Sequence, residues 1–346
     1  MSPCLAAWAN LGSVGFTELM QRKEALDRIR AVGVATLASR RGRVVAQVVL
    51  VAALIFVLLR LRSIWHDSRL DVGDVDWALL VAAVAVSVAG MIASALVWLA
   101  ILRNLGVPTR RWYVAIFLQA QLAKYIPGSV WQYAGRATLA RAYGMPLRRV
   151  MLSLPVELVA SSLAGGSVSL LLLGSWGVLG AAAALFALSA LGVAPVAARL
   201  ARALPDGPRG RELASMILAG ARAVWPFALT LGAFGFGFWL TARALYAVPV
   251  GDLFMYIGAF VAAWLAGLLA VYAPSGLGVR ETVIVAVLHR KLGTSDALVL
   301  AAVSRALLTF VDLLAAAFGF VVARRNSHRN PPRPAALPDP NSQSPV

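Results

Sequence analysis

The chain of 346 residues is strongly apolar, because 60% of its residues are hydrophobic and only 14% are charged, and its mean hydropathy is +0.78. A soluble domain of this size needs more polar surface, so the composition predicts an integral membrane protein. The formal charge of +17 does not indicate nucleic-acid binding, because the basic residues lie in short clusters between apolar runs.

Six apolar runs are long enough to cross the hydrocarbon layer as helices, since a layer of roughly 30 Å takes about 20 residues. They cover residues 44–61, 77–102, 148–174, 177–198, 224–247 and 296–323. We interpret each run as a full transmembrane helix. Together they predict an all-α polytopic membrane protein.

Two further apolar regions, residues 112–142 and 253–291, are interrupted by proline and glycine. The interrupting residues are Pro127, Gly128 and Ser129 in the first region and Pro274, Ser275, Gly276 and Gly278 in the second. We interpret each region as a re-entrant hairpin of two half-helices. Backbone groups freed by such a break cannot face lipid, so we expect both breaks to line protein or a wet cavity.

Basic clusters orient the helices by the positive-inside rule. Arginines at residues 40–43 precede the first span, and Arg324 and Arg325 follow the last one, so we place both termini in the cytoplasm. The basic clusters between these two ends also follow the positive-inside rule only if each broken region returns to the side of the membrane from which it entered. One basic cluster, His289 to Lys291, then lies outside.

The ends of the chain frame one membrane domain. We expect residues 1–43 to form a cytoplasmic tail with the pattern of an amphipathic helix, and residues 44–323 to form the transmembrane domain. Residues 324–346 are basic and then rich in proline, asparagine and serine, which predicts a disordered tail. We expect no soluble catalytic domain.

The two broken regions share an order of features that predicts an inverted repeat. Each has a tyrosine two residues before its proline, small residues after it, and then a helix with an arginine. The following span carries a charge in both, Glu157 in one and Arg305 in the other. One copy entering from each face is typical of transporters that bind their ligand near the midplane, at broken helices. We therefore expect a cavity between the two hairpins.

Seven ionisable residues fall inside the membrane under this interpretation, and their net charge of +1 favours an anionic ligand. They are Lys124, Arg136, Arg280 and Arg305 against Glu157, Glu281 and Asp312. The half-helix N-termini near Ser129 and Ser275 add partial positive charge, which favours phosphate. We expect Arg136 and Arg280 to bind it. We also expect two ion pairs across the repeat interface, Arg280 with Glu157 and Glu281 with Arg305.

Several of these features have a structural alternative. Arg305 and Asp312 are explained equally well by a structural ion pair, and Lys124 by a side chain that extends to the cytoplasmic interface. The break at Pro127 and Gly128 is also compatible with a loop that leads to a helix on the membrane surface. For Arg280 and Glu281 we favour function, because charges inside a membrane are usually functional.

Metal and thiol chemistry have little support in the sequence. The single cysteine, Cys4, lies near the N-terminus, which excludes disulfides and cysteine metal sites. The three histidines, His66, His289 and His328, are scattered. We therefore expect no metal site, no cofactor and no enzymatic activity.

The stretch APSGLGVRETVIVAVL resembles the transmembrane domain of the lysylphosphatidylglycerol synthase family, also called the flippase-like domain family. The family's late signature, a proline followed by Gly-x-Gly and x-Arg-Glu, is matched by Pro274, Gly276, Gly278, Arg280 and Glu281. Its first motif, a Pro-Gly break, an arginine helix and a later glutamate, is similar to Pro127, Gly128, Arg136 and Glu157. The stretch SVWQYA after the first glycine departs from the expected form. The resemblance covers residues 44–323.

In that family the domain is held to move lipids between leaflets, and in some members it is fused to a soluble aminoacyl- or glycosyltransferase. The resemblance therefore implies a flippase for aminoacyl-phosphatidylglycerol or a polyprenyl-phosphate sugar, with a separate transferase as a partner. High alanine, valine and arginine usage is typical of a GC-rich bacterial source, and we expect the protein to lie in the cell membrane. The alternatives are a lipid-modifying membrane enzyme with Glu157 or Glu281 as base, and an ion-coupled carrier of a small solute.

Overall fold

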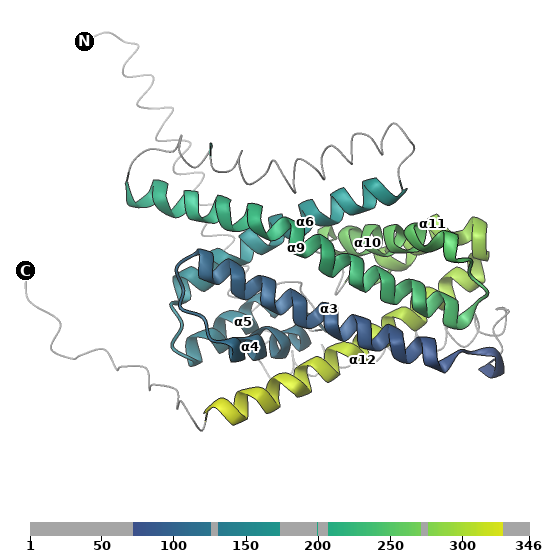
Figure 1. Cartoon of the computed structure of the whole chain (residues 1–346), viewed down its shortest axis with the longest axis horizontal. Helices are drawn as coiled ribbons and strands as arrows, with labels where there is room; N and C mark the ends of the chain where they lie inside the picture. Colours follow the sequence, from purple (N-terminus) through teal and green to yellow (C-terminus); the bar gives the residue numbers. More distant parts are fainter. Residues whose placement is uncertain (1–71, 126–130, 174–198, 200–206, 271–275, 328–346) are drawn as a thin grey trace, which may run out of the picture. The chain divides into compact units, whose positions relative to one another are not determined.

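The computed structural model describes residues 72–125, 131–173, 199, 207–270 and 276–327 (Figure 1). All of them belong to one compact unit, Ile64–Val346. In the part of the chain so described, every regular element is a helix and there is no strand. The all-α prediction is therefore confirmed.

The structure has long helices and short ones. The α-helices are α3 (Trp77–Asn104), α4 (Val114–Ala120), α5 (Trp131–Ala142), α6 (Leu147–Leu173), α9 (Pro208–Leu245), α10 (Leu253–Leu269), α11 (Val279–Leu292) and α12 (Thr294–Ser327). The 3-10 helices are η1 (Val72–Asp74), η2 (Arg111–Tyr113), η3 (Gln121–Tyr125) and η5 (Val250–Asp252). Among the described residues, five helical segments are long and apolar enough to cross a membrane: α3, α6, α9, Val250–Leu269 and Thr294–Asn326. The protein is thus a polytopic helical membrane protein.

Four predicted spans lie on these helices, with some changes of bounds. Helix α9 begins at Pro208, well before the predicted start at residue 224, and α12 continues through Ser327, into the segment predicted as a tail. The predicted spans 44–61 and 177–198, and the N-terminal tail, lie outside the described residues. So do the breaks themselves, with Pro127, Gly128, Ser129, Pro274 and Ser275.

The two predicted hairpins differ in the length of their arms. In the first, Val114–Tyr125 and Trp131–Ala142 each extend about 18 Å at 1.5 Å per residue, which is too short to cross the membrane. In the second, α11 is also short, but Val250–Leu269 is long enough for a full span. Only the first region therefore has the arm lengths expected of a symmetric re-entrant hairpin.

The helices form two halves, α3 to α6 and α9 to α12, whose contacts have the same form. In each half the two helices that flank the break pack together, and the second of them packs against the long helix that follows. Between the halves, α4 packs against α12, and α10 packs against α6 in return. Helices α3 and α9 pack along each other, as Figure 1 shows. The matching contacts within and between the two halves agree with the predicted internal repeat.

Glycines on α9 allow its close approach to two neighbours. A Cβ atom on Gly237 would lie 2.7 Å from Ser87 Oγ and 3.2 Å from the carbonyl oxygen of Ala83, both on α3. A Cβ atom on Gly235 would lie 3.0 Å from the Cα atom of Ile257 on α10. Small residues at such crossings bring helix backbones together where no hydrophobic effect drives association in lipid. Helix α9 therefore holds the two halves in contact.

We expect Gly237→Ala to lower the thermal unfolding midpoint of the protein in detergent, because overpacking of this kind typically costs about 1–3 kcal/mol. Gly232→Ala is the matched control on the same helix, since nothing lies within 4 Å of an added Cβ there. Alanine is the better helix former, so that control should keep or raise the midpoint. Equal midpoints for the two variants would contradict the close contact between α3 and α9.

Candidate functional site

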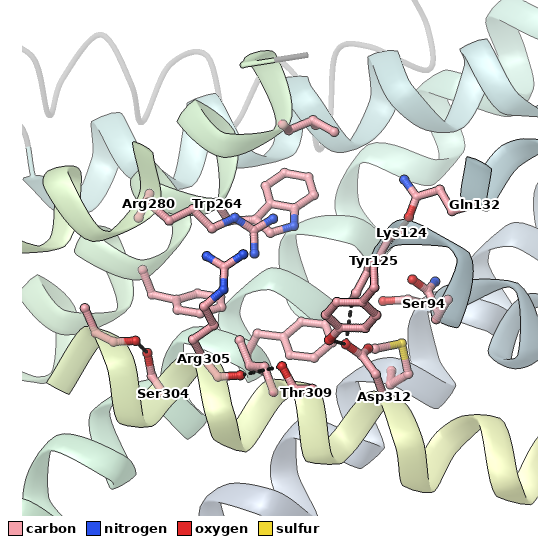
Figure 2. A pocket seen from close by; sticks show the side chains of 18 of the residues that line it. Ser94, Lys124, Tyr125, Gln132, Trp264, Arg280, Ser304, Arg305, Thr309 and Asp312 are labelled. Carbon is pink, nitrogen blue, oxygen red and sulfur yellow. Dashed lines mark hydrogen bonds and ion pairs between the residues drawn. The ribbon is translucent and has the colours of Figure 1, made fainter. Parts of the chain in front are cut away.

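All seven ionisable residues predicted for the membrane interior line one cavity of about 200 Å³. Figure 2 labels four of them, Lys124, Arg280, Arg305 and Asp312. They come from both halves of the structure: η3, α5 and α6 from one half, and α11 and α12 from the other. Residues far apart in the sequence therefore meet at one place, as the repeat predicted. Gly276 and Gly278 lie directly before α11, beside the same cavity residues.

Arg136 on α5 forms an ion pair with Glu157 on α6. Its guanidinium carbon also lies 4.2 Å from the ring centre of Phe117 and 5.7 Å from that of Trp98. The side chain of Arg136 is only 2% exposed. Arginine suits such a place, because its planar guanidinium stacks on aromatic faces and is weakly hydrated. The predicted pairing of Arg280 with Glu157 is therefore wrong.

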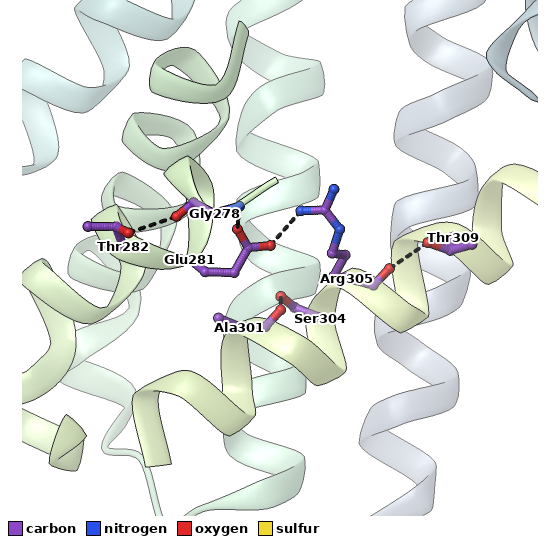
Figure 3. Close-up of polar contacts among 7 residues, drawn as sticks. All are labelled: Gly278, Glu281, Thr282, Ala301, Ser304, Arg305 and Thr309. Carbon is purple, nitrogen blue, oxygen red and sulfur yellow. Dashed lines mark hydrogen bonds and ion pairs between the residues drawn. The ribbon is translucent and has the colours of Figure 1, made fainter. Parts of the chain in front are cut away.

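Arg305 on α12 forms the second ion pair, with Glu281 on α11, at 2.5 Å (Figure 3). The other carboxylate oxygen of Glu281 accepts a hydrogen bond of 2.7 Å from the backbone N–H of Gly278. The predicted pairing of Glu281 with Arg305 is confirmed, although it lies within one half and not across the repeat interface. The N-terminus of α11 is thus capped by its own carboxylate, which neutralises the positive end expected to attract phosphate.

These two ion pairs have the same structural cause. Helices α5 and α6, like α11 and α12, are joined by a short turn and pack against each other. In such a helical hairpin, a residue that precedes the turn lies beside a residue that follows the turn by a similar number of positions. The sign is reversed between the halves, because Arg136 precedes Glu157 while Glu281 precedes Arg305.

Lys124 and Asp312 form the third ion pair, with 2.6 Å between Lys124 Nζ and Asp312 Oδ2. The hydroxyl of Tyr125 donates a hydrogen bond of 2.5 Å to the same oxygen. Asp312 is 1% exposed, and its other oxygen, Oδ1, has no hydrogen-bond partner among the described residues. Arg305 and Asp312 are thus both in ion pairs, as the structural alternative expected, but each pairs with another residue and not with the other.

Arg280 is the fourth cation that lines the cavity, and none of these three ion pairs includes it. In the described part of the chain it forms no ion pair, and its buried Nε atom has no hydrogen-bond partner. Figure 2 shows its guanidinium beside Trp264 and near the guanidinium of Arg305. Two like charges side by side repel each other, and an anion between them relieves the repulsion. The predicted excess of one positive charge is thus located at Arg280.

Two glycines make room for Arg280. A Cβ atom on Gly267 of α10 would lie 2.6 Å from Arg280 Nε. Gly276 has a φ of +67°, and a Cβ atom there would lie 2.7 Å from the Cα atom of Gly267. Gly276 therefore needs glycine for its backbone conformation and for space. The aliphatic stem of Arg280 follows this glycine surface into the cavity.

Much of the remaining cavity wall is aromatic, which sequence reasoning missed. Its members are Phe117, Phe227, Phe234, Phe260 and Trp264, and Tyr125 and Gln132 add polar groups. Nothing in the sequence separates these side chains from the other aromatic residues of the apolar helices. The cavity is therefore lined by both charged and aromatic side chains.

Comparison of the chain with protein-family models, with curated proteins and with solved structures finds no match. Among the described residues, no group of three or more His, Cys, Asp and Glu side chains is placed to hold a metal ion.

Arg136→Ala should destabilise the protein by about 3–5 kcal/mol, because it leaves Glu157 as a buried carboxylate without its partner. Arg148→Ala is the control, since Arg148 pairs with Glu212 at the surface and is 76% exposed. Exposed pairs contribute less than about 1 kcal/mol. Thermal unfolding of both variants in detergent checks this, and similar midpoints would mean that the buried pair is not structural.

Gly267→Ala should impair the site without unfolding the protein, because the new methyl group displaces the Arg280 side chain. Gly166→Ala on α6 is the control, since an added Cβ there meets only Leu265 Cδ2, at an ordinary 3.9 Å. Binding of an anionic short-chain lipid, followed by calorimetry, should weaken at least tenfold in the first variant alone. Unchanged binding in Gly267→Ala would show that the position of Arg280 does not matter.

Proposed function

We propose that this protein is a lipid transporter that moves a lipid with an anionic or phosphate-containing headgroup between the two leaflets of its membrane. One observation carries the proposal: among the described residues Arg280 has no carboxylate partner, whereas the three other cations of the cavity are each paired. Charge inside a membrane protein is costly and is usually retained for function. A bound anion supplies the missing partner.

The size and lining of the cavity favour a headgroup over a whole lipid. At about 200 Å³ it is smaller than the roughly 300–1,000 Å³ of pockets that enclose a complete drug-sized ligand. Its charged side chains suit a phosphate, and its aromatic side chains suit the first apolar atoms of the lipid. The acyl or prenyl chains then remain in the bilayer while the headgroup crosses.

Each charged residue has a distinct place in this proposal. Arg280 and Arg305 bind the phosphate, since guanidinium groups form paired, charge-assisted hydrogen bonds with it. Glu281 holds Arg305 in position through their ion pair. Arg136 and Glu157 hold α5 to α6 as a buried pair, so here we propose a structural role for Arg136 in place of direct ligand binding.

The proposed family is the flippase-like domain family, on the strength of the same residues that line or adjoin the cavity, Gly276, Gly278, Arg280 and Glu281. We propose aminoacyl-phosphatidylglycerol or a polyprenyl-phosphate sugar as the cargo and a bacterial cell membrane as the location. Both termini are proposed to lie in the cytoplasm, and a separate transferase is the proposed source of the lipid.

The arrangement of carboxylates favours transport over lipid modification. A general base needs a carboxylate that is free to accept a proton from its substrate. Glu157 is bonded to Arg136, and both oxygens of Glu281 are engaged, one by Arg305 and one by Gly278. An ion-coupled carrier of a small soluble anion shares the cavity chemistry and is separated from a lipid transporter by experiment.

Leaflet exchange in liposomes tests the proposal. Purified protein should equilibrate labelled anionic lipids between leaflets, and Arg280→Ala should reduce the rate to that of protein-free liposomes, because the headgroup loses its cation. Arg222→Ala is the control, since Arg222 is exposed and bonds Asn104 outside the cavity. Its rate should equal that of the unmodified protein.

Two outcomes would overturn the proposal. Exchange that Arg280→Ala retains in full would remove Arg280 from the site. Folded protein that exchanges no lipid, but takes up a soluble phosphate or carboxylate into sealed vesicles, would establish a solute carrier instead.

A further inference from the structure

The pair of Lys124 and Asp312 breaks the symmetry between the two halves. Aligning α6 with α12 so that Glu157 matches Arg305 places Ala164 at the position of Asp312, since each follows seven residues later. Ala164 and Asp312 are both buried, at 0% and 1% exposure. One half therefore fills this place with a methyl group. The architecture does not require a buried ion pair there, so the pair calls for another explanation.

Asp312 is held asymmetrically by its two partners. Lys124 and Tyr125 both bond Oδ2, while Oδ1 is buried and without a hydrogen-bond partner among the described residues. Lys124 is the more accessible partner, with a side chain that is 25% exposed at the cavity. Its ammonium group can thus turn to a ligand in the cavity, whereas Asp312 is enclosed.

Among the described cavity residues, the one cation without a carboxylate partner is Arg280, and in this proposal Arg280 binds the same anion and does not replace Lys124. The charged and titratable groups that share the cavity with Asp312 are Lys124 and Tyr125 on η3, Arg136 on α5, Glu157 on α6, Arg280 and Glu281 on α11, and Arg305 on α12 itself. Arg136 and Arg305 are already paired. Helices α3, α4 and α9 also pack against α12, but their described cavity residues are uncharged, and η2 contributes none.

An anion that recruits Lys124 leaves Asp312 as a buried carboxylate without a cation. Removing one partner of a buried ion pair is strongly unfavourable, and a group in that position is neutralised by binding a proton. The proton has a ready place on Oδ1, the unbonded oxygen. Tyr125 can keep its bond to Oδ2.

Building on the proposed lipid transport, we propose that Asp312 takes up a proton when the anionic headgroup bound by Arg280 and Arg305 also recruits Lys124, so that transport is coupled to protons. The charges balance: the anion brings one negative charge and the proton one positive charge. The net charge of +1 that the seven cavity residues carry is therefore unchanged by binding. Return of the proton and release of the headgroup restore the ion pair.

The test is calorimetric titration of the purified full-length chain in detergent with short-chain phosphatidylglycerol, a phosphodiester that does not itself titrate near neutral pH. Repeating the titration in buffers of different ionisation enthalpy gives both the affinity and the number of protons bound. We expect uptake approaching one proton for each lipid bound. Asp312→Asn should bind the lipid without proton uptake, and Asp312→Glu should restore it.

Asp252→Asn is the matched control, because Asp252 also pairs with a lysine, Lys291 at 3.1 Å, but at an exposed site. It should leave the proton uptake unchanged. Lys124→Met is a second variant that does not depend on the folding of Asp312→Asn. Without the ammonium group Asp312 is already neutral in the free protein, so binding should take up no proton.

The outcomes separate the inference from the proposal on which it rests. Lipid binding without proton uptake by the unmodified protein, or uptake that Asp312→Asn or Lys124→Met retains, overturns proton coupling and leaves lipid transport standing. Folded protein that binds no anionic lipid overturns lipid transport, and the coupling falls with it.

Discussion

The cost of an uncompensated charge in a low-dielectric interior controls the centre of this structure. Each carboxylate that lines the cavity has a cation within bonding distance, and each such pair joins two different helical elements. Two of these pairs join helices that are consecutive in the sequence and connected by a short turn. They are the pair between α5 and α6 and the pair between α11 and α12. The third connects η3 to α12, far apart in the sequence. The charges therefore add contacts between specific helices to the apolar packing.

The symmetry of the two halves separates scaffold from function. Each half has one arginine–glutamate pair between neighbouring helices, with the order of the charges reversed, as expected of a contact that holds each half together. In the second half the proposed ligand contact of Arg305 is added to that role. Arg280 and the pair of Lys124 and Asp312 have no such counterpart among the described residues. Features that the repeat does not duplicate are the ones that give the cavity its charge and its direction.

The sequence predicted the helices and the charged set well, and it predicted their geometry less well. Apolar length alone located four of the spans, because the thickness of the bilayer imposes it. The seven ionisable residues could be identified for the same reason, since charge is rare in such helices. Their partners could not all be identified, because pairing depends on how far along each helix its neighbour packs, and the sequence does not give that position. In the structure Arg136, and not Arg280, lies beside Glu157. The aromatic wall was missed, because Phe234 or Trp264 looks like any other apolar residue until the helices are assembled.

Glu281 connects the start of one helix to the side of the next. One of its oxygens accepts the N–H of Gly278 at the first turn of α11, and the other accepts a hydrogen bond from Arg305 on α12. Glu281 therefore fixes the position of the Arg305 guanidinium relative to the first turn of α11. A ligand that drew the guanidinium of Arg305 toward itself would therefore also pull on Glu281. Through the second oxygen of Glu281 the displacement would reach the backbone N–H of Gly278, at the start of α11.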